Sequence, residues 1–282
     1  MNQEDIQEFW QEHPCGDSQV GGLTNFGDHQ EAFFREYDNF RYTEESYILR
    51  CLDRIPFKGR ELLEIGLGQG ADAEQIVRRG AIWSGIDLTA EAVERVRLRF
   101  ALRGLSFNQL LQGSALEMPF ADNTFDMVYS FGVLHHIPNI LQAQSEIARV
   151  LKPGGELICM LYAKWSLNFL LSIAVLRRLG LLMLYTGNFN PGGIYGQHLA
   201  NARRLGLRKY LCMENFIHRN TDGPENPYAK VYDLSLVRQD FPGFHILRAY
   251  KRFMHAPPLP VRWLPLDSTL GWHLWVHLTP QK

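Results

Sequence analysis

The chain has 282 residues, enough for one large α/β domain with a full core, or for a domain with a cap. Its hydrophobic content of 46% and charged content of 21% are ordinary for a globular protein. The formal net charge of −1 argues against a large nucleic-acid footprint, which needs a marked basic excess.

The four cysteines are scattered and include no C-x-x-C pair. Neither a disulfide framework nor a zinc site is expected, and we expect reduced, mostly buried thiols in a cytoplasmic protein. The first residues are acidic and lack the apolar core of a signal peptide. Residues 1–60 are rich in aromatic side chains and partly helical in pattern, so we expect them to form a helical lid outside the main sheet.

A glycine-rich turn follows the first strand pattern. Residues 62–70 predict a short buried strand and a tight turn, and residues 71–79 predict a helix. The glycines are Gly66, Gly68 and Gly70. They let the backbone pass close to a ligand, because no Cβ intrudes and a positive φ costs little. The spacing Gly-x-Gly-x-Gly differs from the Gly-x-Gly-x-x-Gly of a dinucleotide site, which disfavours a nicotinamide dehydrogenase.

From residue 61 to 162 the pattern alternates strand and helix over short connections, which is typical of a parallel sheet with right-handed crossovers. The predicted strands cover residues 61–65, 82–86, 106–112, 125–130 and 156–162. A helix over residues 90–103 has Thr89 as its N-cap, and we expect Arg95, Arg97 and Arg99 to face largely outward.

The alternation stops after residue 162. Residues 163–233 predict a helical cap, and the sheet pattern resumes over residues 244–253 and 271–279. Arg177 and Arg178 interrupt the longest apolar stretch at its middle, so we expect a buried or amphipathic cap helix without stable membrane insertion. The expected units are a lid (1–60), a core (61–162), the cap (163–233) and the closing strands of the core sheet (234–282).

Asp87 ends the second strand, seventeen residues after Gly70. In a doubly wound fold, an acidic side chain at this place reaches the ribose hydroxyls of a nucleoside that lies across the strand ends. A carboxylate suits two such hydroxyl donors. The alternative is that Asp87 only caps the helix that begins after Thr89.

The glycine turn, Asp87 and the segments 113–120, 125–130 and 131–138 together resemble the class I S-adenosylmethionine (SAM) methyltransferases. The resemblance is to their small-molecule branch, of the type found in ubiquinone and menaquinone biosynthesis. It implies an α/β, Rossmann-like doubly wound sheet of seven strands in the order 3-2-1-4-5-7-6, with the last strand antiparallel. It also implies SAM as cofactor and S-adenosylhomocysteine as product.

The same resemblance assigns the cofactor site residue by residue. Around the methionine part it places Glu64, Gly66, Gly68 and Gly70; at the ribose, Asp87 and Leu88; at the adenine, Ser114 and Ala115; and near the sulfonium, Ser130. Many relatives carry Asp where this chain has Ser114. In relatives an N-terminal helical segment folds over the cofactor, so Arg41 is a candidate partner of the SAM carboxylate, and Tyr37 or Tyr42 a candidate cover for the sulfonium. Alternatively, the aromatics are ordinary core and Arg41 is a surface charge.

Two histidines and two cap residues are candidates for a catalytic role. His135 and His136 point about 100° apart if helical, so they cannot bind one metal together and no metal site is expected. They either shape the loop beneath the cofactor, or one of them acts as a general base. In the cap, Tyr195 and His198 either contribute to an acceptor pocket or are structural.

The favoured interpretation is a cytoplasmic methyltransferase that acts on a small, apolar or aromatic biosynthetic metabolite by in-line displacement, without a nucleic-acid partner. One alternative is an RNA or protein methyltransferase. The neutral charge argues against it, and so does the sequence Ser-Phe-Gly-Val at 130–133, where enzymes that methylate base amines carry Asn/Asp-Pro-Pro-aromatic. A SAM-binding protein without catalysis is the other alternative. The methylated atom and the oligomeric state, a homodimer included, stay open.

Overall fold

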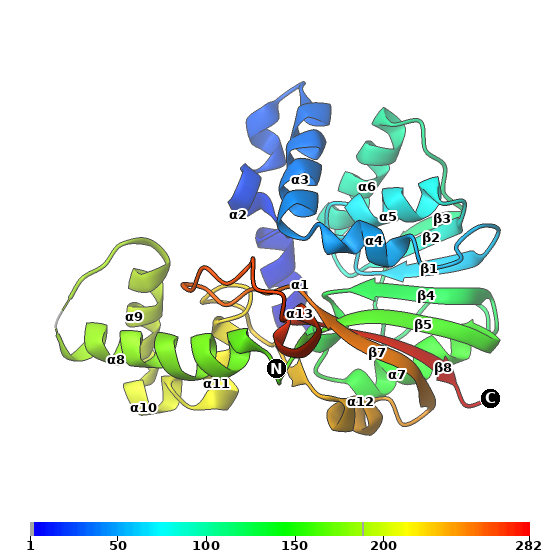
Figure 1. The fold of residues 1–282 in the computed structure, drawn as a ribbon. Helices are drawn as coiled ribbons and strands as arrows, with labels where there is room; N and C mark the ends of the chain where they lie inside the picture. The colour runs from blue at the N-terminus through cyan, green and yellow to red at the C-terminus, as the bar shows by residue number, and fades with distance from the viewer. Residues whose placement is uncertain (1–2, 188) are drawn as a thin grey trace.

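The computed structural model of the chain describes residues 3–187 and 189–282. At its centre is a mixed sheet in the order β3-β2-β1-β4-β5-β8-β7, with the short β6 paired to the end of β5 (Figure 1). The strands are β1 (Glu61–Ile65), β2 (Ile82–Asp87), β3 (Gln109–Gln112), β4 (Phe125–Phe131), β5 (Leu151–Ala163), β6 (Val231–Tyr232), β7 (Phe244–Arg252) and β8 (His273–Pro280).

The strand order confirms the predicted topology. Apart from the two-residue β6, the order along the sheet is 3-2-1-4-5-7-6, as expected. The first five strands are parallel, and β8 runs antiparallel to both β5 and β7. The parallel strands therefore end at one edge of the sheet, where ligands bind in doubly wound folds.

Helices cover both faces of the sheet. The helices α4 (Tyr47–Leu52), α5 (Ala71–Arg78) and α6 (Ala90–Leu102) lie on one face, and α7 (Ile140–Val150) and α12 (Leu234–Asp240) lie on the other (Figure 1). Successive side chains of a strand enter opposite cores: Leu62 packs with the first group of helices and Leu63 with the second. Both side chains are fully buried, which explains why the parallel strands are apolar at nearly every position.

The N-terminal segment forms a helical lid over one end of this body. Its helices are α1 (Gln3–Glu12), α2 (Asp17–Val20), η1 (Leu23–Phe26) and α3 (Gln30–Glu44). The lid explains one wrong expectation. Arg95 and Arg99 do not face outward, because α2 and α3 cover that side of α6. Arg97 alone of the three is largely exposed.

Buried ion pairs hold the lid to the body. Arg99 is fully buried, donates from Nε to Glu74 Oε2 of α5 at 2.9 Å, and pairs with Asp38 of α3. Arg95 donates from Nη2 to Asp17 Oδ2 of α2 at 2.9 Å. The predicted N-cap of α6 is present as well, since Thr89 Oγ1 accepts a hydrogen bond from the Ala92 amide at 3.3 Å.

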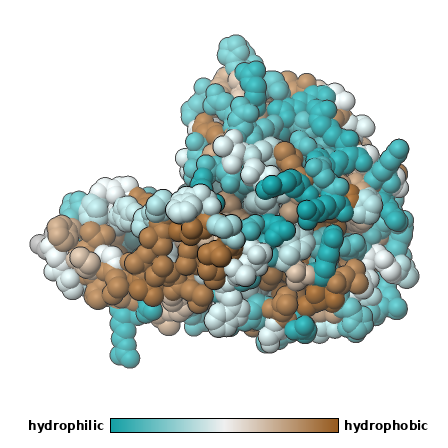
Figure 2. All heavy atoms as spheres, viewed as in Figure 1, coloured by the Kyte–Doolittle hydropathy of each residue, from teal (hydrophilic) through white to brown (hydrophobic). Residues whose placement is uncertain are grey.

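The predicted helical cap projects from the end of β5, on the left of Figure 1. It consists of η3 (Asn168–Arg177), which continues directly into α8 (Arg178–Thr186), followed by α9 (Gly193–Leu205), α10 (Leu207–Tyr210) and α11 (Met213–Arg219). Among the described helices, the continuous helix from Asn168 to Thr186 is the one long and apolar enough to cross a membrane. Only 17% of its most apolar window is buried, so of the two expected forms, a buried or an amphipathic helix, the buried one is wrong (Figure 2).

Replacing Arg99 by methionine should lower the free energy of unfolding by roughly 3 kcal/mol, because Glu74 and Asp38 lose their fully buried partner and keep only Arg78 and Arg103, which are partly exposed. Arg97→Met on the same helix is the matched control. Its side chain is 49% exposed and its ion pair with Glu94 is a surface pair, worth at most about 1 kcal/mol. Urea unfolding followed by circular dichroism measures both values. Equal losses for the two variants would show that the buried pairs do not hold the lid.

Candidate functional site

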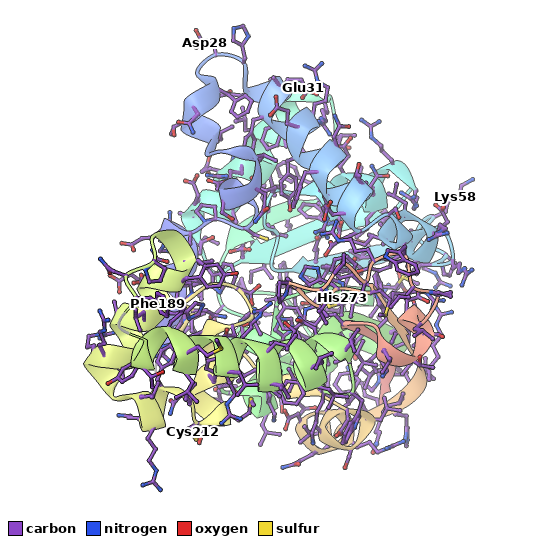
Figure 3. All side chains as sticks on the ribbon, turned by 60° about the vertical axis from the view of Figure 1, so that its left-hand side comes forward. Asp28, Glu31, Lys58, Phe189, Cys212 and His273 are labelled. Carbon is purple, nitrogen blue, oxygen red and sulfur yellow. The ribbon has the colours of Figure 1, made fainter. Side chains whose placement is uncertain are left out.

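A cavity of 990 Å³ lies at the carboxyl edge of the parallel strands, between the body, the lid and the cap. Its walls come from α1 to α3, from the loops after β1, β2, β3 and β4, and from the segments around residues 194–197, 221–225 and 253–273. In Figure 3 the labelled His273, one of the lining residues, lies where the sheet meets these helical segments. This edge is where the sequence predicts the ligand.

The glycine turn forms part of the cavity floor. Gly66 has a φ of +78° and Gly68 a φ of +49°. A Cβ on Gly66 would come within 2.1 Å of a Val133 methyl group, whereas a Cβ on Gly68 would meet only Cys15 at 3.8 Å. The backbone at Gly68 is therefore open to a ligand. Gly70 does not line the cavity; it is the left-handed N-cap of α5, packed against Val96.

Asp87 lies at the end of β2 and lines the cavity, as the ribose interpretation requires. Its Oδ2 accepts from the Leu67 amide at 2.7 Å, and its Oδ1 accepts from the amide and hydroxyl of Thr89, both at 2.8 Å. Burial raises the pKa of Asp87 against these hydrogen bonds. The carboxylate thus joins the glycine turn to the start of α6. Asp87 therefore contacts the residue that begins α6, as the alternative interpretation expects, and the ribose contact stays a prediction.

The predicted adenine border is closed by the first helix of the lid. Leu88, Ser114 and Ala115 all line the cavity. Ser114 Oγ donates to Gln3 Oε1 of α1 at 2.8 Å and accepts from the Leu116 amide at 3.0 Å. The Ser114 hydroxyl therefore has a partner in α1 that the sequence pattern does not reveal.

Glu64 is buried at the cavity wall, and its Oε2 accepts from Trp83 Nε1 at 2.7 Å. Burial and the nearby charge of Asp72 raise the pKa of Glu64 well above its usual value. Ser130, in contrast, lies outside the cavity lining. It is fully buried and donates to the carbonyl of Ile65 at 3.0 Å, which joins β4 to β1. The hydroxyl of Ser130 therefore joins two strands, and its predicted place near the sulfonium stays a prediction.

Arg41 is a lining residue, neither a surface charge nor a free cation. Its Nε and Nη2 donate to Asp72 Oδ1 and Oδ2 at 3.0 and 2.8 Å, and its Nη1 donates to Glu45 Oε2 at 3.2 Å. The guanidinium also lies 4.7 Å over the ring of Phe131. These carboxylates compete directly with the predicted contact between Arg41 and the carboxylate of SAM.

The two lid tyrosines behave differently. Tyr37 is buried and lines the cavity. Tyr42 does not line it; its hydroxyl donates to Asp72 Oδ1 at 3.3 Å. Asp72 also accepts from the hydroxyl of Tyr129 at 3.0 Å. Sequence reasoning missed Asp72, although an acidic residue in the first turn after a glycine loop was the available signal.

His136 lines the cavity with both ring nitrogens facing oxygen atoms. Its Nδ1 donates to the Tyr228 carbonyl at 2.6 Å, and its Nε2 lies 3.3 Å from Asp222 Oδ2. Asp222 accepts from the hydroxyl of Tyr162 at 2.7 Å. Although burial opposes it, the hydrogen bonds from His136 and Tyr162 lower the pKa of Asp222. His136 is thus fixed through Nδ1 and lies beside a carboxylate through Nε2, an arrangement compatible with either predicted role, shaping the loop or acting as a base.

The other three catalytic candidates lie outside the cavity lining. His135 is fully buried behind it, where burial keeps its pKa well below the usual value. Tyr195 is 61% exposed on α9. His198 Nδ1 hydrogen-bonds to the hydroxyl of Tyr210 at 2.7 Å, and burial lowers its pKa to about 4. The alternative reading of the cap residues as structural therefore fits His198.

Several aromatic side chains line the cavity and form an aromatic wall, which the sequence patterns do not reveal. Its members are Trp10, Phe131, Tyr162, Phe253 and Trp272. Tyr162 and Trp272 stack with ring centroids 4.5 Å apart. Trp10 meets His136 edge to face at 5.2 Å. These residues come from four distant segments of the chain, so only the folded structure brings them together.

Comparison with known proteins agrees with this geometry. Residues 63–159 match a family described as "Methyltransferase domain". Residues 63–159 therefore form a SAM-dependent methyltransferase domain. The matched residues run from β1 to the middle of β5, which includes the glycine turn, Asp87 and the loop with His136. SAM is the cofactor of such a domain, and the open backbone at Gly68 and the carboxylate at the end of β2 fit it.

Curated relatives of this methyltransferase domain match over part of their length. The sterol 24-C-methyltransferase ERG6B of Gibberella zeae is 35% identical over 126 residues, 44% of this chain and 33% of that protein. The fatty-acid O-methyltransferase of Mycolicibacterium smegmatis is 37% identical over 35% of each chain. The probable chloroplastic tocopherol O-methyltransferase of Oryza sativa is 32% identical over 57% of this chain and 44% of that protein. The chain thus spans less than half the length of these relatives.

Solved structures share the fold over most of the chain. A SAM-dependent methyltransferase of Thermotoga maritima, described as a possible histamine N-methyltransferase, aligns with a TM-score of 0.52 at 17% identity, over 92% of this chain and 98% of its own. A SAM-dependent methyltransferase of Methanosarcina mazei aligns with a TM-score of 0.53 at 15% identity, over 82% and 96%. At this identity the likeness concerns the fold alone.

Asp87→Ala should weaken SAM binding by about 1–3 kcal/mol, the usual cost of losing a hydrogen bond to a charged group. Asp87→Asn keeps the shape but removes the charge. It should also bind SAM more weakly if the carboxylate accepts from the ribose. Thr89→Val is the control, because it removes one capping partner of Asp87 and leaves the carboxylate. Calorimetric titration with SAM compares the three variants; wild-type affinity in both Asp87 variants would refute the ribose contact.

Because the pKa of Glu45 is raised in the folded protein, the free energy of unfolding should fall as the pH rises. Burial raises the pKa of Glu45 from 4.5 to about 7, against the opposing charge of Arg41. Between these values the folded state holds a proton that the unfolded state has released, so stability falls as pH increases through this window. Glu45→Gln should flatten that part of the curve. Thermal midpoints from pH 4 to pH 8 test this, and parallel curves for variant and wild type would contradict it.

Proposed function

We propose that the protein transfers a methyl group from SAM to a small lipid-like acceptor with an apolar or aromatic body. The observation that carries this proposal is the continuous cavity, which joins the glycine turn and Asp87 to the aromatic wall. Its 990 Å³ is at the upper end of ligand pockets, which span about 300–1,000 Å³, so there is room for an acceptor beside a cofactor.

The names of the curated relatives support the same class of acceptor. They denote methyltransferases for a sterol, a fatty acid and a tocopherol, all largely apolar molecules. The aromatic wall of this chain offers such a molecule flat apolar surfaces. Glu45, Asp72 and Asp222 lie around these surfaces, so the cavity also holds fixed polar groups that can orient the acceptor.

SAM supplies an activated methyl group on a good leaving group, so the protein has mainly to align the two reactants and exclude water. The lid helices and the cap cover the cavity, which serves the exclusion of water. Tyr37 and Phe131 present aromatic faces inside it, and aromatic faces attract cations such as a sulfonium. Arg41 is held against Asp72 and Glu45, so it keeps these carboxylates in place rather than serving as an acid or base.

The finer expectations stay predictions. These are the cytoplasmic location, the domain boundaries, in-line displacement, a biosynthetic role and a homodimer. The roles of the individual site residues in binding SAM are proposals too. They are supported for the residues that line the cavity, which are Gly66, Gly68, Asp87, Leu88, Ser114 and Ala115. They are less supported for Gly70, Tyr42 and Ser130, which do not line it.

The purified protein should bind SAM and S-adenosylhomocysteine in calorimetric titrations and should not bind NAD. With labelled SAM it should then methylate a fatty acid, a sterol or a tocopherol precursor, and not RNA. Trp272→Ala removes part of the aromatic wall, so it should raise the KM for the acceptor about tenfold or more without changing SAM affinity. Binding of SAM with transfer only to RNA or protein would refute the proposed acceptor class, and binding of NAD alone would refute the cofactor.

A further inference from the structure

The long cap helix is apolar on the side that faces away from the protein as well as on the side that packs against it. Its outward stripe consists of Leu171, Val175, Leu179, Leu182 and Met183, which are 36–69% exposed. Its inward side buries Ile173 and Leu181 in the core beside the polar Asn168 and Ser172. Arg177 Nη1 donates to the carbonyl of Asn220 at 2.6 Å. A surface helix normally presents polar side chains to the solvent. The outward stripe therefore needs an apolar partner.

The charge of the cap indicates which partner this is. Residues 163–233 contain nine Lys and Arg against four Asp and Glu, a net charge of +5, although the whole chain has −1. Arg203, Arg204, Arg208 and Lys209 are exposed on α9 and α10, in the same lobe as the stripe (Figures 1 and 2). A second copy of the chain would bring two positive lobes together. An anionic membrane offers both the negative charge and the apolar interior.

The residues just before the long cap helix are of types found at lipid interfaces. Trp165 is 55% exposed just before the helix, and Lys164 beside it is partly exposed. Tryptophan and lysine are favoured at the boundary between lipid and water. Arg177 and Arg178 lie at the middle of the helix, which argues for binding parallel to the surface and against spanning.

We propose that the outward stripe and the basic residues of α9 and α10 dock the protein on an anionic lipid membrane. The cap then lies in the plane of the interface, with the apolar side chains in the lipid and the arginines at the headgroups. A nucleic acid would pair with the basic residues but would leave the stripe exposed to water, so the apolar stripe favours the membrane.

The docked surface is continuous with the cavity. Ile194, at the start of α9, is 53% exposed and also lines the cavity, and α8 packs against α9. An apolar acceptor could thus pass from the membrane to the aromatic wall without crossing water. This last step rests on the proposed function, whereas membrane docking does not, because vesicle binding is measured without any acceptor or SAM.

Sedimentation with vesicles tests the docking directly. The whole protein should sediment with vesicles of phosphatidylcholine and phosphatidylglycerol, and much less with phosphatidylcholine alone. Leu179→Ser/Met183→Ser should lower the partition coefficient about tenfold or more. Leu141→Ser on α7 is the matched control, since Leu141 and Leu179 are both 53% exposed, and it should bind as the wild type does.

A second variant tests the charge separately. Arg208→Gln/Lys209→Gln should weaken binding to the anionic vesicles roughly tenfold and reduce its dependence on salt. All these side chains are exposed, so the thermal midpoints should stay close to that of the wild type. Loss of binding in a variant that remains folded then reports on docking.

Three outcomes would overturn the proposal. One is the absence of wild-type binding to anionic vesicles, and another is an equal loss in the Leu141→Ser control. The third is a dimer in sedimentation equilibrium that Leu179→Ser/Met183→Ser dissociates, which would assign the stripe to a second copy. If RNA binds the protein and the vesicles do not, the basic residues belong to a nucleic-acid surface instead.

Discussion

The arrangement of the site depends on buried ion pairs between the lid and the first two helices of the body. Arg41 of α3 donates two hydrogen bonds to Asp72 of α5, and Arg99 of α6 pairs with both Glu74 and Asp38. A buried charge without a partner is costly, so each pair strongly disfavours separation of its helices. The lid therefore supplies part of the wall of the cavity at the carboxyl edge of the sheet.

These pairs also set the electrostatics of the cavity. Glu45, Asp72 and Asp222 line it, as do Arg41, Arg262 and several histidines, and Arg41 donates to both Glu45 and Asp72. Several of these groups therefore have partners within the protein before a ligand binds. A cofactor that carries both a sulfonium and a carboxylate meets charges that are fixed in position, which reduces the reorganisation that binding requires.

The sequence predicted the sheet and the cofactor edge because their signals are local. The glycine turn, Asp87 and the N-cap Thr89 each depend on neighbours within a few residues, and the alternation of strands and helices gave the strand order through the family resemblance. Long-range packing produced the errors. Arg95 and Arg99 carry no local sign that a lid will cover them. The aromatic wall was not predicted either, because residues far apart in the sequence form it.

One lid helix touches both ends of the cavity. Gln3 of α1 accepts from Ser114 at the predicted adenine border, and Trp10 of the same helix meets His136 beside the aromatic wall. A displacement of α1 would open the two ends together. The ten residues of this helix therefore couple the adenine border of the cavity to its aromatic wall.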